Sequence, residues 1–135
     1  MADGDLLGVA RQTVALARRK GAQQAAGGAY RVRSVEVQWR DGQLEKVTEA
    51  TTRGLGVELY VDGRYSAVST SDLRPEAVER FVEDAVALTR TLSPDPHRAL
   101  PDPALYQGRA EVDLDLEDPR YGELDAYAMA GCVID

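Results

Sequence analysis

The sequence predicts an α+β fold, a two-layer sandwich in which two main helices pack on one face of about four antiparallel strands arranged as two hairpins. Residues 54–61 alternate apolar and other side chains, as a strand with one buried face does. Asp62-Gly63 then supplies the residue pair that a tight hairpin turn favours, because such turns need positive φ. Two segments, one near the start and one after residue 74, have the apolar spacing of amphipathic helices.

The first helix is predicted to end at Gly21, directly after three cations that suit the negative pole of a helix dipole. Its apolar face is expected to consist of Leu6, Leu7, Ala10, Val14 and Ala17.

A long strand is expected to follow and to end in a first hairpin turn at Asp41-Gly42. Tyr30 and Val32 share one parity, whereas Val35, Val37 and Trp39 share the other, which predicts a bulge or break near residues 33–34. The returning strand, residues 43–52, alternates poorly. Its Thr and Val content favours a strand, although the spacing of residues 44, 47 and 50 also fits a helix.

The second helix is predicted to run from Pro75 to about Thr91, since proline suits the first helical position. Arg74 then falls at the cap, where Ser or Asp would be favoured, so Ser71 or Asp72 is an alternative cap. The apolar stripe of this helix is expected to comprise Val78, Phe81, Val82, Ala85, Leu88 and Leu92.

The domain organisation expected is an N-terminal α+β domain over residues 1–93, followed over residues 94–135 by a Pro-rich extended linker and the truncated start of a further helix. That helix is expected between Glu123 and Ala130. The second face of the sheet is expected to stay open for solvent or a partner.

Composition excludes several classes of function. The chain of 135 residues carries 16 basic and 23 acidic residues, and a net charge of −7 argues against direct nucleic-acid binding. One cysteine, Cys132, cannot form an internal disulfide, and neither a signal peptide nor an apolar run of membrane-spanning length is present. The sequence therefore predicts a cytoplasmic protein that does not bind membranes.

The search for catalytic chemistry assigns no catalytic, cofactor-binding or metal-ligating residue. His97 is the single histidine, so the chain lacks the spaced ligands of a zinc peptidase site. A Ser69–Asp72–His97 triad has no nucleophile-elbow sequence, and residues 54–56 lack the rest of a phosphate loop. The acidic run 113–118 departs from a calcium loop, with Asp118 at the glycine position, and reads as a solvated linker.

Three residues resemble those that bind partners: Trp39, Arg40 and Arg53. Tryptophan and arginine are enriched at binding hot spots. For Trp39 the competing interpretation, which its parity with Val35 and Val37 favours, is a core anchor that faces the helices.

An ordered set of motifs resembles the N-terminal domain of the TldD/PmbA family of zinc metallopeptidases, also described as modulators of DNA gyrase. Two motifs, Ser69-Thr-Ser-Asp-Leu and Ser93-Pro-Asp-Pro, are more similar to the PmbA (TldE) branch. The set also includes Val37-Gln-Trp-Arg-Asp-Gly, Gly54-Leu-Gly-Val, Leu100-Pro-Asp-Pro and Asp113-Leu-Asp-Leu. Residues 26–29 and the C-terminal Gly-Cys-Val-Ile-Asp depart from the family pattern, which leaves the start of the first strand and the last helix open.

The resemblance implies a non-catalytic domain that contributes to subunit assembly and to an enclosed chamber for peptide substrates. It implies a homodimer, or a heterodimer with a TldD-type subunit, and places zinc only in the C-terminal half of catalytic members. The alternative is a free-standing module that binds a peptide or protein through its open sheet face or a sheet edge.

Overall fold

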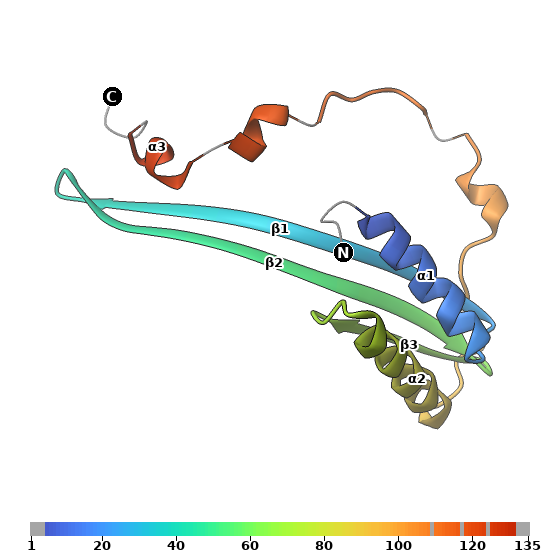
Figure 1. Ribbon diagram of the computed structural model, residues 1–135. Helices are drawn as coiled ribbons and strands as arrows, with labels where there is room; N and C mark the ends of the chain where they lie inside the picture. Colours follow the sequence, from blue (N-terminus) through green and yellow to red (C-terminus); the bar gives the residue numbers. More distant parts are fainter. Residues whose placement is uncertain (1–4, 109, 117, 124, 132–135) are drawn as a thin grey trace. The chain divides into compact units, whose positions relative to one another are not determined.

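The computed structural model describes residues 5–108, 110–116, 118–123 and 125–131. It is an α+β fold with a three-stranded antiparallel sheet in the order β1-β2-β3 and helices packed against it (Figure 1). The main elements are α1 (Leu6–Arg19), β1 (Gln24–Arg40), β2 (Gln43–Val61), β3 (Arg64–Thr70) and α2 (Pro75–Thr91). The short helices η1 (Pro103–Tyr106), η2 (Pro119–Glu123) and α3 (Ala126–Gly131) follow.

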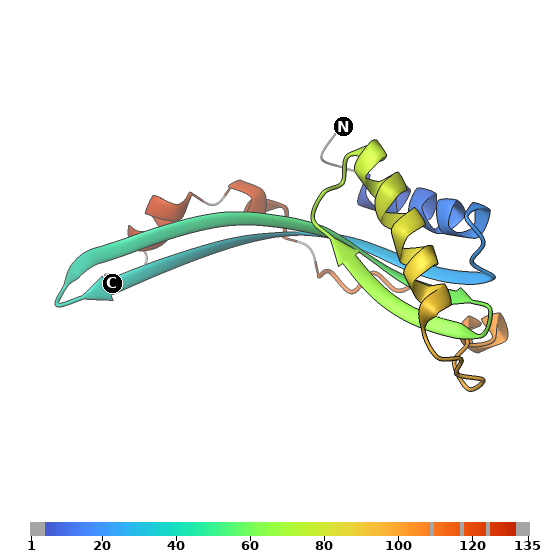
Figure 2. The same ribbon diagram turned by 90° about the horizontal axis from the view of Figure 1, so that it is seen from below.

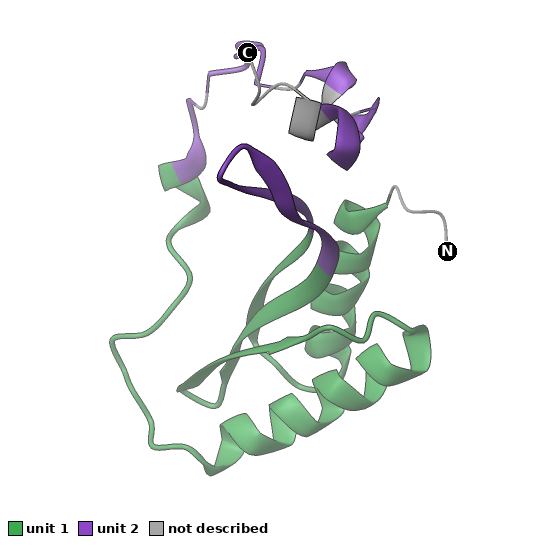
Figure 3. Ribbon diagram, turned by 90° about the vertical axis from the view of Figure 1, so that its left-hand side faces the viewer, with its two compact units in different colours: residues 1–31, 53–105 green, residues 32–52, 106–135 purple. Residues whose placement is uncertain are grey.

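The chain divides into two compact units (Figure 3). The first, here called the core unit, contains the residues up to Arg31 and Arg53–Leu105. The second contains Val32–Thr52, here called the outer hairpin, and the chain from Tyr106 onward. Both β1 and β2 therefore contribute one part to each unit.

The prediction of about four strands is wrong, because the returning strand of the first hairpin and the strand at residues 54–61 are one element, β2. Gly54 and Gly56 lie where the two predicted strands would meet, and neither has a positive φ. Without a turn conformation at these glycines, the backbone stays extended from Gln43 to Val61.

The bulge predicted near residues 33–34 is likewise not observed, because β1 is continuous from Gln24 to Arg40. Ala25 and Ala29 already share the parity of Val35 and Val37 on the more buried face. Tyr30 and Val32 lie on the other face, where about half of each side chain is exposed. The start of the strand, which the sequence left open, therefore precedes residues 26–29.

The turn between β2 and β3 forms at Asp62-Gly63 as predicted, and both residues have positive φ. The register pairs Val61 with Arg64 and Leu55 with Thr70. Asp41 and Gly42, which join β1 to β2, also have positive φ. These four residues adopt the left-handed conformation that favours Asp and Gly in tight turns.

The second helix, α2, has the predicted bounds, whereas α1 ends at Arg19, two residues before the predicted end at Gly21. Both helices pack on one face of the sheet (Figure 2). Asp5 caps α1 by accepting a hydrogen bond from the Gly8 N–H, and Gly21 ends the turn after it with φ +112°. In α2, Arg74 occupies the N-cap without a side-chain cap bond. Leu7 and Leu88, both expected on apolar faces, are instead more than half exposed.

The hydrophobic core lies between the two helices and the sheet. Four alternate residues of β2, Leu55, Val57, Leu59 and Val61, are almost completely buried, as the period-2 pattern requires. They pack with the buried helix residues Ala17, Val78, Val82, Ala85 and Val86. At β1, Gly27 allows close packing, since a Cβ there would approach Val14 to 3.1 Å.

The Pro-rich segment after α2 is tied back to the core unit. The Asp95 N–H donates to the Gly63 carbonyl at 2.8 Å, and the Leu100 N–H donates to Gln24 Oε1 at 3.0 Å. Further along, the helix expected between Glu123 and Ala130 is present as α3, which begins at Ala126, and η2 precedes it. Among the described residues, no helix is long and apolar enough to span a membrane.

Candidate functional site

The face of the sheet opposite the helices carries a shallow groove in the core unit. In β2, Gly56 and Glu58 alternate with the buried residues, and their cross-strand neighbours in β3 are Ser69 and Ala67. The groove has a volume of about 560 Å³. Its lining residues are Ala26, Gly27, Gly28, Tyr30, Gly56, Val57, Glu58, Ala67, Val68 and Ser69.

Small residues give this groove its depth, and a tyrosine borders it. No atom lies within 4 Å of a Cβ built on Gly28, so the strand is open at this point. Tyr30 reaches across to β2, where a Cβ on Gly54 would come within 2.6 Å of its hydroxyl oxygen. Glycine at position 54 is therefore needed for the observed place of the Tyr30 ring.

Another part of the same face is covered by the segment that follows α2. The Arg98 guanidinium lies 4.5 Å from the centre of the Tyr65 ring, a cation–π contact, and Tyr65 packs against Tyr60 with ring centres 5.1 Å apart. Burial, followed by the nearby Glu58 carboxylate, raises the pKa of the Tyr60 phenol. The sheet face expected to be open is thus partly occupied by this chain.

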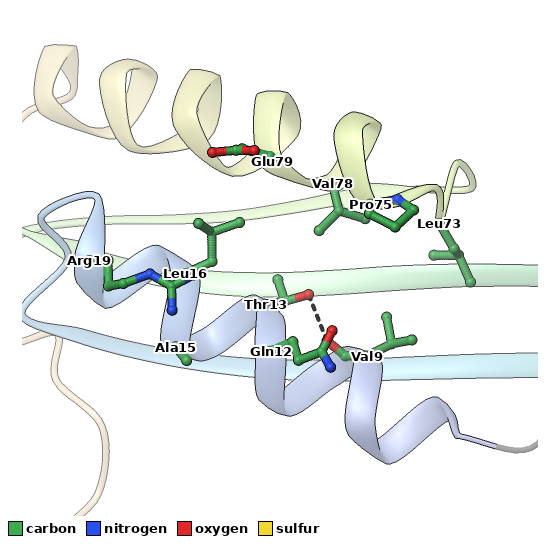
Figure 4. A pocket seen from close by; sticks show the side chains of 10 residues that line it. All are labelled: Val9, Gln12, Thr13, Ala15, Leu16, Arg19, Leu73, Pro75, Val78 and Glu79. Carbon is green, nitrogen blue, oxygen red and sulfur yellow. Dashed lines mark hydrogen bonds between the residues drawn. The ribbon is translucent and has the colours of Figure 1, made fainter. Parts of the chain in front are cut away.

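A second concavity, of about 340 Å³, lies between α1 and α2 (Figure 4). Its apolar part comes from Val9, Leu16, Leu73 and Val78, with Arg19 and Glu79 among its polar residues. Gln12, Thr13, Ala15 and Pro75 complete the lining. Near it, Lys20 Nζ lies 3.5 Å from Glu79 Oε1 and 3.6 Å from Glu83 Oε2.

The three predicted partner residues do not form one site. Trp39 and Arg40 belong to the outer hairpin, where Arg40 pairs with Glu45 at 3.3 Å, whereas Arg53 belongs to the core unit. Trp39 is half-buried but is not among the residues that build the helix-covered core. Its indole Nε1 is buried without a hydrogen-bond partner, which is unusual for tryptophan.

The described residues contain no group of three or more His, Cys, Asp or Glu side chains that could hold a metal ion. Of Ser69, Asp72 and His97, Asp72 binds Arg74 and His97 donates its backbone N–H to Asp95. In the acidic run, Asp113 accepts the Asp115 N–H at 2.9 Å, a local turn contact. Cys132 lies outside the described residues.

Sequence reasoning missed both concavities. The groove of the sheet had a usable signal, because Gly28, Gly56 and Ala67 all lie at open-face positions once the strand parity is known. No sequence pattern predicts that the segment after α2 covers Tyr65. The residues that accept its hydrogen bonds, Gln24 and Gly63, are ordinary polar or turn residues in the sequence.

Comparisons with known proteins place this fold in a family. A sequence profile described as PmbA/TldA metallopeptidase domain 1 matches residues 28–89. The metalloprotease PmbA of Escherichia coli O157:H7 is 35% identical over 85 residues, and a metalloprotease PmbA homolog of Haemophilus influenzae is 31% identical over 112 residues. These matches take in 63% and 76% of this chain but only 19% and 24% of those proteins, so the chain spans about a fifth to a quarter of their length.

Two solved structures are similar. The crystal structure of a candidate modulator of DNA gyrase from Bacteroides thetaiotaomicron superposes with a TM-score of 0.86 at 30% identity, covering 98% of this chain and 31% of that one. TldE from Thermococcus kodakarensis superposes with a TM-score of 0.70 over 93% of this chain and 27% of that one, and its 15% identity shows the fold alone. The chain belongs to the TldD/PmbA family and carries its N-terminal domain.

Proposed function

We propose that this chain acts as a non-catalytic N-terminal domain of a TldD/PmbA-type zinc-dependent peptidase, contributing to subunit assembly and to the wall of the substrate chamber. The observation that carries the proposal is the match of residues 28–89 to the first domain of that family. The whole chain corresponds to under a third of the similar proteins, which leaves the larger part of such a protein to supply the catalytic residues.

The chemistry of the described residues supports a role in assembly. They present two concave surfaces, one on the sheet and one between the helices. In this proposal zinc belongs to the C-terminal half of catalytic family members. The partner is a second copy or a TldD-type subunit, the substrate is a peptide, and the location is cytoplasmic.

The test is the molar mass of the chain by light scattering, measured alone and after mixing with a catalytic TldD-type subunit, with zinc content determined on the same samples. The expected result is a zinc-free chain that dimerises or joins the catalytic subunit. A chain that remains monomeric in both samples, or that binds zinc stoichiometrically by itself, contradicts the proposal.

A second candidate function is a free-standing module that binds an extended peptide on the open sheet face, and the groove over Gly28 and Gly56 favours it. Gly28→Val would reduce the space in this groove, and nothing lies within 4 Å of the new Cβ. Gly122→Val is a matched control, since its Cβ also meets no atom.

The probe for this second function is a fluorescently labelled polypeptide that has been reduced and carboxymethylated so that it cannot fold. Fluorescence anisotropy should detect binding to the natural chain and to Gly122→Val, and a loss of about tenfold or more for Gly28→Val. Equal binding by all three chains, or no binding by any, contradicts this function.

A further inference from the structure

The two helices that cover the sheet carry opposite charge. Within its 14 residues α1 holds three arginines and no acidic residue, and Lys20 follows directly. In α2, four carboxylates outnumber two arginines. The cations are Arg11, Arg18, Arg19 and Lys20, and the carboxylates are those of Glu76, Glu79, Glu83 and Asp84. The exposed charged side chains are thus basic on α1 and mainly acidic on α2, where Arg80 and Arg90 are also exposed. The four cations are here called the basic strip, and the four carboxylates the acidic strip.

Among the described residues, the ion pairs between these strips are those of Lys20. The Lys20 ammonium lies between the carboxylates of Glu79 and Glu83, at 3.5 and 3.6 Å. Arg11, Arg18 and Arg19 on α1 are exposed, as are Glu76 and Asp84 on α2. Most of the complementary charge is therefore displayed to the outside of the layer.

Between the strips lies the apolar part of the 340 Å³ concavity (Figure 4). Leu16 of α1 and Val78 of α2 point into it from opposite sides, and Leu73 closes the end near the start of α2. An apolar centre with charged side chains at its rim is the usual composition of a protein interface.

We propose that this helical layer docks a second copy of the same chain, related by a two-fold axis, so that α1 of each copy lies on α2 of the other. In such a dimer one patch meets itself, and a patch with a basic half and an acidic half is complementary to its own rotated copy. The inference rests on the proposed role in assembly and names the surface that performs it.

Charge also explains why a second copy fits this layer in particular. The net charge of −7 makes two copies repel each other over most of their surface. Opposing an arginine-bearing α1 to the carboxylates of α2 offsets this repulsion locally and fixes the relative orientation of the copies. An interface of standard size buries about 800 Å² on each partner.

The discriminating experiment is sedimentation equilibrium of the full chain and of charge-reversal variants. Glu79→Lys with Glu83→Lys reverses the acidic strip, and because each change adds two charges, the net charge moves from −7 to −3. The repulsion between two copies that comes from their net charge is thereby reduced. In the proposed contact, however, the basic α1 of one copy now meets a basic α2 of the other. We expect dimerisation to weaken about tenfold or more, opposite to the effect of net charge alone.

Arg11→Glu with Arg19→Glu reverses the basic strip in the same way. Alone it should also dimerise about tenfold or more weakly than the natural chain, but an equimolar mixture of the two variants restores both complementary contacts. We expect the mixed dimer to form with a dissociation constant within about threefold of the natural one.

The matched control is Glu36→Lys with Glu45→Lys on the outer hairpin, which gives the same net charge of −3 without touching the helices and should dimerise at least as well as the natural chain. Far-UV circular dichroism checks folding of every variant. Should the loss of the Lys20 ion pairs unfold the first variant, Glu76→Lys with Asp84→Lys replaces it with the same expected result.

Three results would overturn the proposed surface: a natural chain that is monomeric at about 0.2 mM, an acidic-strip variant that dimerises as tightly as the natural chain, or a mixture of variants that stays monomeric. Each leaves the proposed assembly function open to its own test, because joining a catalytic TldD-type subunit is measured separately by light scattering.

Discussion

The carboxylate of Asp72 is held by a single neighbour, Arg74, which donates both its backbone N–H and its guanidinium N–H groups to it. These hydrogen bonds, the side-chain ones first, lower the pKa of Asp72 from 3.8 to about 2. Because the pKa in the folded state lies below the unfolded value, the pair stabilises the fold fully above about pH 4 and loses its contribution as the pH falls towards 2.

The pKa of Asp72 can be measured by NMR titration of its carboxyl carbon. In the natural chain we expect a midpoint near 2, and in Arg74→Gln a return towards 3.8, because the charge-assisted hydrogen bonds are lost. Asp118 is the internal control, since Arg120 lowers its pKa by the same kind of contact. A midpoint near 2 that survives Arg74→Gln would show that another group holds the carboxylate.

A buried pair of hydroxyl groups joins α2 to β3. Ser66 Oγ and Thr89 Oγ1 are 2.6 Å apart, and Thr89 also donates to the Ala85 carbonyl at 2.6 Å. Because the single hydroxyl proton of Thr89 is used there, Ser66 must be the donor in the pair. Thr89 is completely buried, so its hydroxyl cannot be replaced by bulk water.

Thr89→Val should lower the free energy of unfolding by about 1–3 kcal/mol, because it leaves the Ser66 hydroxyl buried without an acceptor. Adding Ser66→Ala removes that donor and should recover part of the loss. Urea unfolding of the two single variants and the double variant measures the coupling. Strictly additive losses would show that the two hydroxyl groups do not depend on one another.

At the scale of elements, α2 begins without the side-chain cap that most helices have. Arg74 occupies the cap position, and Asp72, an alternative cap in the sequence, binds Arg74 and not the first turn of the helix. Arg74→Ser would supply a hydroxyl acceptor for that turn, with an expected gain of about 0.5–1 kcal/mol.

In a thermal melt this gain corresponds to about 3 °C. Arg74→Ala is the matched control, because it removes the same contacts to Asp72 without adding a cap. A serine variant that melts no higher than the alanine variant would show that the added hydroxyl does not cap α2.

The helices and the turns could be predicted from the sequence, whereas the strands could not be fully delimited. The end of a helix and a tight turn are each predicted by a few neighbouring residues. Examples are the cations before Gly21 and the pair Asp62-Gly63. A strand boundary depends on pairing with distant residues. The predicted boundary between residues 52 and 54 is wrong, and the close approach of Tyr30 explains why glycine occupies position 54.

At the scale of the whole molecule, the candidate surfaces escaped prediction because each is made by segments far apart in the chain. The concavity between α1 and α2 is lined by Leu16 and Val78, which are far apart in the sequence. The covered part of the sheet face likewise brings Tyr65 together with Arg98. Residue type alone did not identify a common binding site, since Trp39, Arg40 and Arg53 are divided between two units. Their roles as partner contacts remain predictions.

The distribution of buried residues indicates that the core unit determines stability. Among the described residues, every buried apolar side chain except Ala126 belongs to that unit. Replacing the outer hairpin, Val32–Thr52, by a short Asn-Gly turn should therefore preserve cooperative folding and change the melting temperature by less than about 5 °C. Far-UV circular dichroism is the measurement, because the excision also removes Trp39, the single tryptophan.

Leu59→Ala tests whether the shortened chain keeps the same core, since Leu59 is completely buried in β2. The substitution should lower the free energy of unfolding by about 2–5 kcal/mol, and by the same amount in the full and the shortened chain. A broad, non-cooperative transition of the shortened chain, or a much smaller effect of Leu59→Ala within it, would show that the core depends on the outer hairpin. Equal effects would make the core unit the independently folding part of this domain, on which the groove of the sheet and the helical layer can be studied without the outer hairpin.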